Sequence, residues 1–239
     1  MPTHFISDLH LQDSRPDLTE IFFRYLRGPA RDSEGLYILG DLFETWVGDD
    51  DDAPLAQDAR GHLRELTATG VPCWFMHGNR DFLVGKTFSE ATGVQVLDDP
   101  TVVNLYNQPT LLLHGDSLCT DDQPYQAIRS QLRSAVWQAQ FLAQPLPARR
   151  AFAEAARAKS REHTAMAGEA IMDVTESAVC DVAQAHGIRR IIHGHTHRPA
   201  QHWHDATNGR VERWVIADWR DTGEVLLVSA DGISRQVLR

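Results

Sequence analysis

The chain has 239 residues, of which 42% are hydrophobic, enough for one sizeable core or for a core with a subdomain. Its formal charge of -10 disfavours nucleic acid as the main partner, because binding a phosphate backbone needs a basic face. The three cysteines have no paired spacing, which favours a reducing compartment. The first residues lack a signal-peptide pattern, and no window approaches the roughly 18 apolar residues of a membrane span. We therefore expect a cytosolic protein.

Five short apolar runs each end at a polar cluster, a pattern typical of buried strands followed by tight loops. The runs and their clusters are Thr3–Ser7 before Asp8-Leu9-His10, Leu36–Leu39 before Gly40-Asp41, Cys73–Met76 before His77-Gly78-Asn79, Thr110–Leu113 before His114-Gly115-Asp116, and Arg190–Ile192 before His193-Gly194-His195-Thr196-His197. Helical spacing of apolar residues over Asp17–Leu26 and Leu55–Leu66 predicts βαβ units with a central sheet. Ligands of open α/β sheets lie at the carboxyl ends of strands, so we expect the clusters to converge on one site.

Between Pro124 and Gly187 no strand is evident, and abundant Ala, Arg, Gln and Glu predict helices with a break at Pro145-Leu146-Pro147. We expect a helical insertion within the fold. Residues 125–170 contain seven basic and three acidic residues together with many apolar ones, a composition that suits an anionic membrane surface. The alternative is that the apolar residues pack the insertion onto the main sheet, and the residues alone favour neither.

The C-terminal part has the pattern of antiparallel strands over Arg213–Ala217, Glu224–Ser229 and Ile233–Leu238. Asp231-Gly232 is suited to a two-residue hairpin turn between the last two strands. This part of the chain therefore predicts a second sheet that packs on the first.

Each polar cluster is weak evidence by itself, since Gly-Asp, Gly-Asn and a lone His often occur in turns and at strand ends. Together they supply carboxylate oxygen, amide oxygen and imidazole nitrogen without a thiolate, a set that suits Mn, Fe or Zn. The candidate ligands are Asp8, His10, Asp41, Asn79, His114, His195 and His197. Seven ligands for two ions imply one shared carboxylate, and Asp41 is the natural bridge. Two ions about 3.5–4 Å apart can activate water and hold a phosphoryl oxygen during in-line displacement.

With these blocks in order across nearly its whole length, the sequence resembles the calcineurin-like metallophosphoesterase superfamily. The resemblance implies an α/β fold, a two-sheet αββα sandwich, in a single metallophosphoesterase domain over residues 1–239. It implies one ion held by Asp8, His10, Asp41 and His197, and a second ion held by Asp41, Asn79, His114 and His195.

One block departs from the superfamily, which usually continues Gly-Asn-His, whereas this chain has Gly78-Asn79-Arg80-Asp81. A guanidinium does not act as a general acid near neutral pH, because its pKa stays above about 12. It can instead stabilise developing phosphate charge with paired hydrogen bonds. A leaving group of low pKa needs no protonation, so Arg80 favours cleavage of a pyrophosphate bond over cleavage of an alkyl phosphate ester.

Longer strings resemble a narrower family, the pyrophosphatases of the lipid A pathway. These strings are Leu36–Glu44, Gly48–Asp51, His77–Phe82, His114–Asp122, Ala170–Val174 and Ile192–Pro199. The resemblance implies hydrolysis of UDP-2,3-diacylglucosamine at the α-phosphorus, usually with Mn2+, to give UMP and 2,3-diacylglucosamine 1-phosphate. The insertion, at about 122–170, would then form a lid over the substrate and its acyl chains. The chain would be a monomer that lies peripherally on the cytoplasmic face of the inner membrane.

The same resemblance assigns catalysis to Asp41, Asn79, Arg80 and His195. It assigns substrate contacts to Asn79, Arg80, Asp122, Ser160, Thr164 and His195. Asp122 also fits a helix cap before Pro124, and Ser160 also fits a plain helix surface. The family often has Asn where this chain has Thr164 and Lys where it has Ala167, and Arg157 or Arg161 could compensate.

Two other hypotheses are a metallophosphoesterase acting on another nucleotide and a non-enzymatic scaffold with the same fold. A small soluble substrate would need no apolar groove, and a scaffold would not need all seven candidate ligands.

Overall fold

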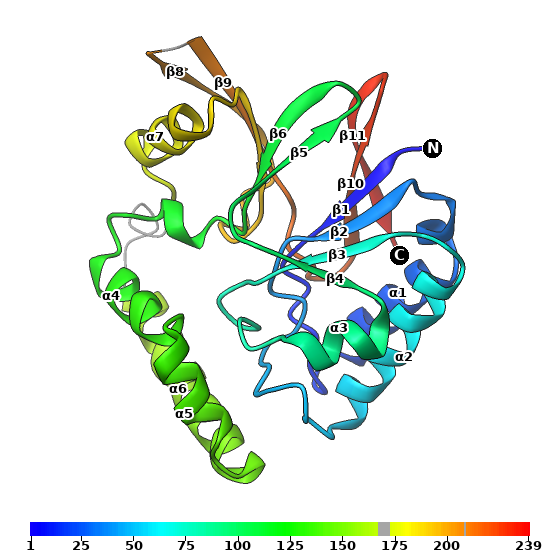
Figure 1. The fold of residues 1–239 in the computed structure, drawn as a ribbon, viewed down its shortest axis with the longest axis vertical. Coiled ribbons are helices and arrows are strands. Elements are labelled where there is room, and N and C mark those ends of the chain that lie inside the picture. The colour runs from blue at the N-terminus through cyan, green and yellow to red at the C-terminus, as the bar shows by residue number, and fades with distance from the viewer. Residues whose placement is uncertain (167–172, 208) are drawn as a thin grey trace.

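The chain forms two mixed sheets that pack face to face, with helices on both outer sides (Figure 1). This computed structural model describes residues 1–166, 173–207 and 209–239, with side chains over 1–161, 173–207 and 209–239. The arrangement confirms the predicted α/β fold with a two-sheet αββα sandwich.

The first sheet has six strands in the order β11-β10-β1-β2-β3-β4. Their bounds are β1 Thr3–Ile6, β2 Gly35–Ile38, β3 Cys73–Met76, β4 Gln95–Leu97, β10 Gly223–Ser229 and β11 Gly232–Leu238. Strands β1 to β4 are parallel neighbours, whereas β10 pairs antiparallel with β1. Three helices follow or link the parallel strands, and they are α1 Pro16–Arg27, α2 Pro54–Ala68 and α3 Lys86–Thr92, beside the 3-10 helix η1 Pro29–Asp32.

The second sheet has five strands in the order β5-β6-β7-β9-β8. Their bounds are β5 Thr101–Leu105, β6 Gln108–Leu112, β7 Arg190–His193, β8 Gln201–Ala206 and β9 Gly209–Val215. β6 and β7 are parallel, so the loops that follow them leave the same edge of the sheet. Helix α7, Glu176–His186, packs on the outer face of this sheet, and the 3-10 helix η2, Asp116–Leu118, follows β6.

Three apolar layers hold the sandwich together. One layer lies between α1–α3 and the first sheet, one between the two sheets, and one between the second sheet and α7. Neighbouring residues of one strand enter different layers, as Phe5 packs between the sheets while Ile6 packs toward the helices. Because both faces of β1 are covered, all four of its residues are buried, and the strand therefore appears in the sequence as a continuous apolar run.

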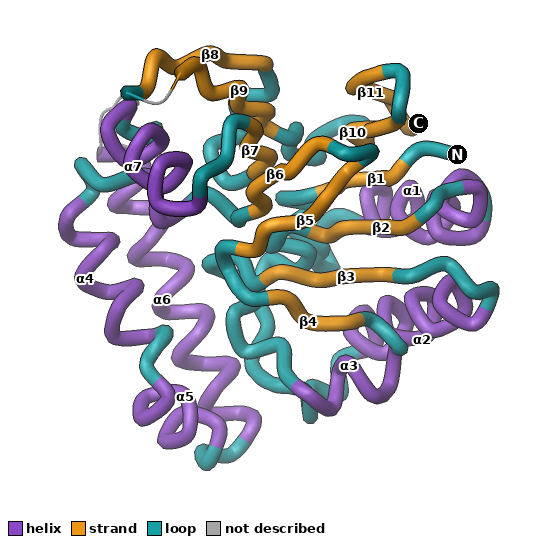
Figure 2. Tube along the Cα trace, turned by 45° about the horizontal axis from the view of Figure 1, so that its top comes forward, coloured by secondary structure: helices purple, strands orange, loops and turns teal. Residues whose placement is uncertain are grey.

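The predicted insertion consists of three described helices, α4 Gln123–Leu132, α5 Ala135–Leu142 and α6 Leu146–Met166. Asp122 and Ser134 cap α4 and α5, since their side chains accept hydrogen bonds from backbone N–H groups in the first helical turns. The helices lie beside the sandwich, on the side to which the carboxyl ends of β1–β3 point (Figure 2). None of the helices in the described part of the chain is both long and apolar enough to cross a membrane.

Several sequence predictions need correction. The three predicted C-terminal strands do not form the second sheet together, because β10 pairs with β1 and β11 pairs with β10, so both extend the first sheet. Of the three, β9 joins the second sheet, where it pairs with β7 and β8. The β10–β11 hairpin exists, but its two loop residues are Ala230 and Asp231, while Gly232 pairs with Ser229 as a strand residue. Strands β4 and β5 and helix α3 were not predicted.

Candidate metal centre

The parallel strands bring the predicted polar clusters to one place. Asp8, Asp41 and Asn79 follow β1, β2 and β3, which are adjacent in the first sheet. The loops after β6 and β7 carry the candidate histidines of the second sheet. The backbone N–H of His195 donates a hydrogen bond of 2.8 Å to Asp8 Oδ2, so the two sheets are joined directly at the site.

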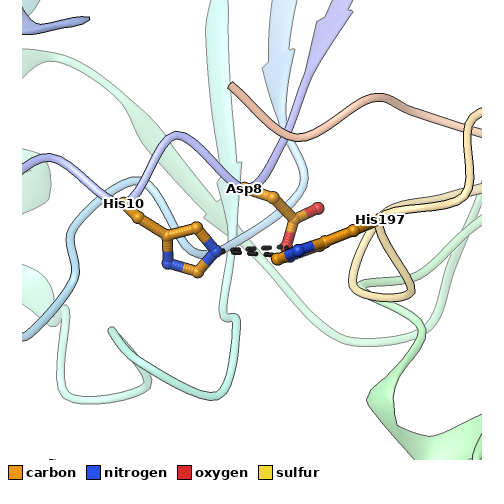
Figure 3. Close-up of side chains that lie close together, drawn as sticks. All are labelled: Asp8, His10 and His197. Carbon is orange, nitrogen blue, oxygen red and sulfur yellow. Dashed lines mark hydrogen bonds and ion pairs between the residues drawn. The ribbon is translucent and has the colours of Figure 1, made fainter. Parts of the chain in front are cut away.

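The first group of candidate ligands consists of Asp8, His10 and His197, whose side chains point toward one another (Figure 3). Nε2 of His10 lies 3.3 Å from Nε2 of His197, and Asp8 Oδ1 lies 3.4 Å from the latter nitrogen. One ligand atom from each of the three side chains falls within 4.8 Å of the other two, a separation that a single cation can span.

The second group surrounds Asp41 and Asn79. One end of the Asn79 carboxamide lies 3.1 Å from His114 Nε2, from His195 Nδ1 and from Asp41 Oδ2. Asp41 Oδ2 is also 4.0 Å from His10 Nε2, while Asp41 Oδ1 is 3.8 Å from His114 Nε2. The Asp41 carboxylate therefore lies between the two groups, as expected of a bridging ligand.

Backbone conformation singles out the same residues. Within the described part of the chain, seven residues other than glycine have a positive φ, and five of them are candidate ligands. These five are Asp8, His10, Asp41, His195 and His197, with φ between 50° and 66°. Left-handed backbone is costly for L-residues and concentrates at functional sites, where the surrounding structure holds it in place.

The electrostatics of the cluster suit bound cations. Burial alone would raise the pKa of Asp8, but the adjoining imidazoles, above all His197, lower it well below its ordinary value. Burial likewise opposes the charged form of His114, yet the Asp41, Asp116 and Asp8 carboxylates raise its pKa to about 9. Among the described residues, the buried Oδ1 of Asp8 has no hydrogen-bond partner. Buried carboxylates that depend on protonated histidines for compensation fit a site where metal ions would supply the positive charge.

Two glycines allow the ligand loops to approach one another. A Cβ on Gly78 would collide with the side chain and backbone of Asp41, and a Cβ on Gly194 would collide with the side chains of Ser7 and Asp8. Any larger residue at either position would push apart loops that carry candidate ligands. The glycines in the Gly-Asn and Gly-His motifs therefore have a steric role in the site.

Three acidic residues outside the candidate ligand set support the site. Glu44 Oε2 lies 3.2 Å from His10 Nδ1, so it orients the ring whose other nitrogen faces the first group. Asp81 is fully buried and accepts hydrogen bonds from the backbone N–H groups of Leu42 at 2.7 Å and Gly78 at 2.9 Å. Asp116, also fully buried, accepts from Tyr125 and Arg129, which anchors α4 beside the site. All three lie in strings already singled out, but their contacts depend on packing.

An apolar cavity of about 430 Å³ adjoins the metal centre, between the core and the insertion. Asn79, Arg80 and Ser160 line it, and their substrate contacts stay predictions. Asp122 caps α4 by accepting from the Tyr125 N–H at 3.1 Å, so the helix-cap alternative holds for this residue. The predicted contact at Thr164, and the departure at Ala167, lie outside the described side chains.

A two-sheet sandwich with adjoining Asp, Asn and His clusters at its strand ends defines a metal-dependent phosphoesterase. The chain belongs to the calcineurin-like phosphoesterase family, whose sequence profile matches residues 1–199. A protein of Xanthomonas campestris pv. campestris named UDP-2,3-diacylglucosamine hydrolase is 50% identical over 245 residues, covering 100% of this chain and 99% of its own. A Cellvibrio japonicus protein of the same name is 48% identical and covers 98% of both chains. A solved archaeal phosphodiesterase aligns over 100% of both chains with 12% identity and a TM-score of 0.48.

Proposed function

We propose that this hydrolase cleaves the pyrophosphate bond of UDP-2,3-diacylglucosamine at the α-phosphorus, giving UMP and 2,3-diacylglucosamine 1-phosphate for lipid A synthesis. The observation that carries the proposal is the apolar cavity that opens on Asn79 and Arg80 beside the metal centre. A small phosphoester would leave such a cavity unfilled, whereas acyl chains would bury its lining. The names of relatives at 48–50% identity over nearly full length point to the same substrate.

The seven candidate ligands would hold two divalent cations, which we propose to be Mn2+. The first would be held by Asp8, His10, Asp41 and His197, and the second by Asp41, Asn79, His114 and His195. Bound there, the cations would supply an activated water and charge stabilisation at the phosphoryl oxygens. Burial, together with the nearby charge of His114, lowers the pKa of His195 to about 4, so its ring is neutral at physiological pH and its nitrogen can coordinate.

We propose that Arg80 binds phosphate oxygens of the substrate, where negative charge develops during cleavage. Its Nε lies 3.6 Å from Asp41 Oδ2, its Nη1 lies 3.8 Å from Glu44 Oε1, and its backbone N–H donates to Asp41 Oδ1 at 2.8 Å. The guanidinium stays charged throughout and offers several N–H donors, so it stabilises developing negative charge without transferring a proton. A sugar phosphate leaves as a stable anion, which matches this chemistry.

We propose that the insertion is a lid over the lipid half of the substrate within one domain spanning residues 1–239. Its cavity-facing side carries Ile128 and Phe152, which are 49% and 48% exposed, together with Trp137 and Phe141. Several large apolar side chains that stay half exposed around one cavity are typical of a ligand-binding groove. The lid also carries Val136 and Leu142 at exposed positions, which are 69% and 42% exposed.

Together with the exposed Lys159 and Arg161, these exposed apolar side chains support peripheral contact with the cytoplasmic face of the inner membrane, by a monomer. The other basic residues of the insertion pair with acidic residues outside it, and they are Arg129, Arg133, Arg149, Arg150 and Arg157. Flotation with liposomes containing anionic lipid should carry the protein upward, and added salt should weaken the association. Protein that stays at the bottom of the gradient at low salt would contradict the membrane proposal while leaving the proposed reaction intact.

The reaction is tested by product analysis with UDP-2,3-diacylglucosamine and Mn2+, before and after chelation, beside bis(p-nitrophenyl) phosphate. We expect metal-dependent release of UMP from the lipid nucleotide and feeble turnover of the small ester. Turnover of the small ester alone would retain the metal centre and reject the substrate. A protein inactive on both with Mn2+ would reject the hydrolase proposal as stated.

A further inference from the structure

A second cavity of about 430 Å³ adjoins the metal centre on the other side of α6. It is enclosed by the loop after β1, the loop after β2, the start of α2 and one face of α6. The lining residues that matter here are Gln12, Phe43, Glu44, Arg150, Arg157 and Arg161. The two cavities share Arg157 and the segment 45–47, so α6 divides one space from the other above the reacting centre.

The two faces of α6 differ in chemistry. Toward the second cavity it presents Arg150, Glu154, Arg157 and Arg161, which recur at helical spacing along one stripe. Toward the lipid-facing cavity it presents Phe152, Ala153, Ala156 and Ser160, together with Lys159 and the shared Arg157. The second cavity is therefore lined by more arginine side chains of α6, and the lipid-facing cavity by more of its apolar side chains.

Contacts connect the second cavity to the metal centre. Glu44 lines this cavity and lies 3.2 Å from His10 Nδ1. Arg157 Nε donates to Glu44 Oε1 at 3.0 Å, with both side chains largely buried. Arg161 lies one turn further along α6, is exposed, and acts on the Glu44 carboxylate at longer range. Through Glu44, the second cavity reaches the edge of the candidate metal centre at His10.

We infer that the second cavity is the nucleoside subsite, which binds the uridine half of the substrate. The inference rests on the proposed function, because it needs a substrate whose α-phosphorus carries a nucleoside on one side and a lipid phosphate on the other. In-line displacement places water and the leaving lipid phosphate on opposite sides of that phosphorus, so the nucleoside must project sideways. A separate cavity flanking the reacting centre fits that direction.

The lining of the second cavity matches a pyrimidine nucleoside. Uracil has two carbonyl acceptors on its edge, and ribose has hydroxyl groups, so both need polar partners. Arg161 and the Gln12 amide supply N–H donors, while the partly exposed Ala53 and Leu55 supply apolar surface for the faces of the ring. The apolar cavity across α6 would leave the same groups of the base without partners.

Product inhibition of the Mn2+-loaded enzyme tests the assignment, with UDP-2,3-diacylglucosamine as substrate. The inhibition constants of UMP and of 2,3-diacylglucosamine 1-phosphate are measured for the wild type, for Arg161→Ala and Gln12→Ala in the second cavity, and for Ile128→Ala in the lipid-facing cavity. We expect the two second-cavity variants to raise the constant for UMP by about tenfold, and to raise it more than the constant for the lipid product. Ile128→Ala should show the opposite order. Lys86→Ala, at an exposed position on α3, is the matched control.

Ribose 5-phosphate serves as a second probe because it lacks the base. The wild type should bind UMP more tightly than ribose 5-phosphate, and Arg161→Ala should narrow that difference. If the wild type releases UMP but both second-cavity variants keep the wild-type inhibition constants, the subsite assignment is overturned and the proposed function is kept. The same conclusion follows if the inhibition constants for UMP and for the lipid product rise equally in both variants. Failure of the wild type to release UMP from the lipid nucleotide, with turnover of bis(p-nitrophenyl) phosphate intact, would overturn the proposed function and this inference together.

Discussion

The metal centre holds five of its candidate ligands in left-handed backbone conformation, at a cost of about 1 kcal/mol or more for each residue. Hydrogen bonds between the loops offset this cost, because Asp8 N–H donates to the Gly40 carbonyl at 3.1 Å and His10 N–H to the Asp41 carbonyl at 3.0 Å. The backbone therefore directs the ligand side chains toward one point before any cation binds.

Glu44 orients His10 from outside the ligand set, with 3.2 Å between its Oε2 and the ring Nδ1. The Glu44 carboxylate favours a proton on Nδ1 of His10, which leaves Nε2 free to coordinate a metal ion. Glu44→Gln removes the charge that holds the proton there. We expect Mn2+ to bind about 10–100-fold more weakly, which calorimetric titration of the metal-free protein would measure. Glu20→Gln, on the exposed face of α1, is the control. An unchanged dissociation constant would show that His10 needs no such partner.

Asp81 ties the loops after β2 and β3 together by accepting from the Leu42 and Gly78 N–H groups. Asp81→Ala leaves buried donors without acceptors, so we expect a loss of about 2–4 kcal/mol in the free energy of unfolding. Urea denaturation of the metal-free protein measures this loss apart from any change in metal affinity. Asp58→Ala, at an exposed position on α2, should change stability little, and equal effects of the two substitutions would contradict the assigned role.

At the scale of elements, the insertion is fastened to the core at two points. Near its start, Asp116 accepts a hydrogen bond of 2.6 Å from Tyr125 and one of 2.8 Å from Arg129, both on α4. Near the start of α6, Arg149 is only 2% exposed and donates to the Val47 carbonyl at 2.6 Å and to Asp50. The acidic run 49–52 therefore positions the helix that separates the two cavities.

Arg149→Ala should loosen α6 from the core, because it removes these hydrogen bonds and leaves the Val47 carbonyl buried without its donor. We expect KM for the lipid nucleotide to rise several-fold and amide exchange in α5 and α6 to accelerate, while exchange in β1–β3 stays slow. Hydrogen-exchange mass spectrometry and steady-state kinetics measure the two effects. Arg24→Ala on the exposed face of α1 is the control, and unchanged exchange in α6 would argue against the fastening.

At the scale of the molecule, three apolar layers provide the main driving force, and one buried histidine makes their stability depend on pH. His4, on β1, is 4% exposed, and its Nδ1 lies 2.9 Å from the Tyr25 hydroxyl. Burial lowers its pKa from 6.5 to about 4, with a smaller opposing effect of Asp32. Between pH 6.5 and about 4, the His4 ring is therefore protonated in the unfolded chain and neutral in the folded chain.

The contribution of His4 to stability is fully present above pH 6.5 and is lost progressively as the pH falls toward 4. We expect His4→Gln to flatten the pH dependence of unfolding in this range by about 1–2 kcal/mol, allowing for solvent screening. Urea midpoints of the metal-free proteins, measured at several pH values, report the difference. His186→Gln at an exposed position should keep the wild-type slope, and parallel slopes for the wild type and His4→Gln would refute the prediction.

The sequence by itself determined the strands of the metal centre, all seven candidate ligands and the presence of a helical insertion. These features are local, because a buried parallel strand is a continuous apolar run and its ligand follows within a few residues. The same holds for the cap at Asp122, which the residues before Pro124 already indicated.

Only the tertiary structure decided which sheet each C-terminal strand joins, since β10 pairs with β1 across almost the whole chain, and a local pattern carries no information about a distant partner. It also decided the roles of Glu44, Asp81 and Asp116. The sequence of a loop does not show whether its acidic residue is exposed to water or buried against a group that is distant in the chain. The position of α6 between the two cavities was decided in the same way. Helical spacing shows that a helix has two faces, but packing alone decides what each face meets.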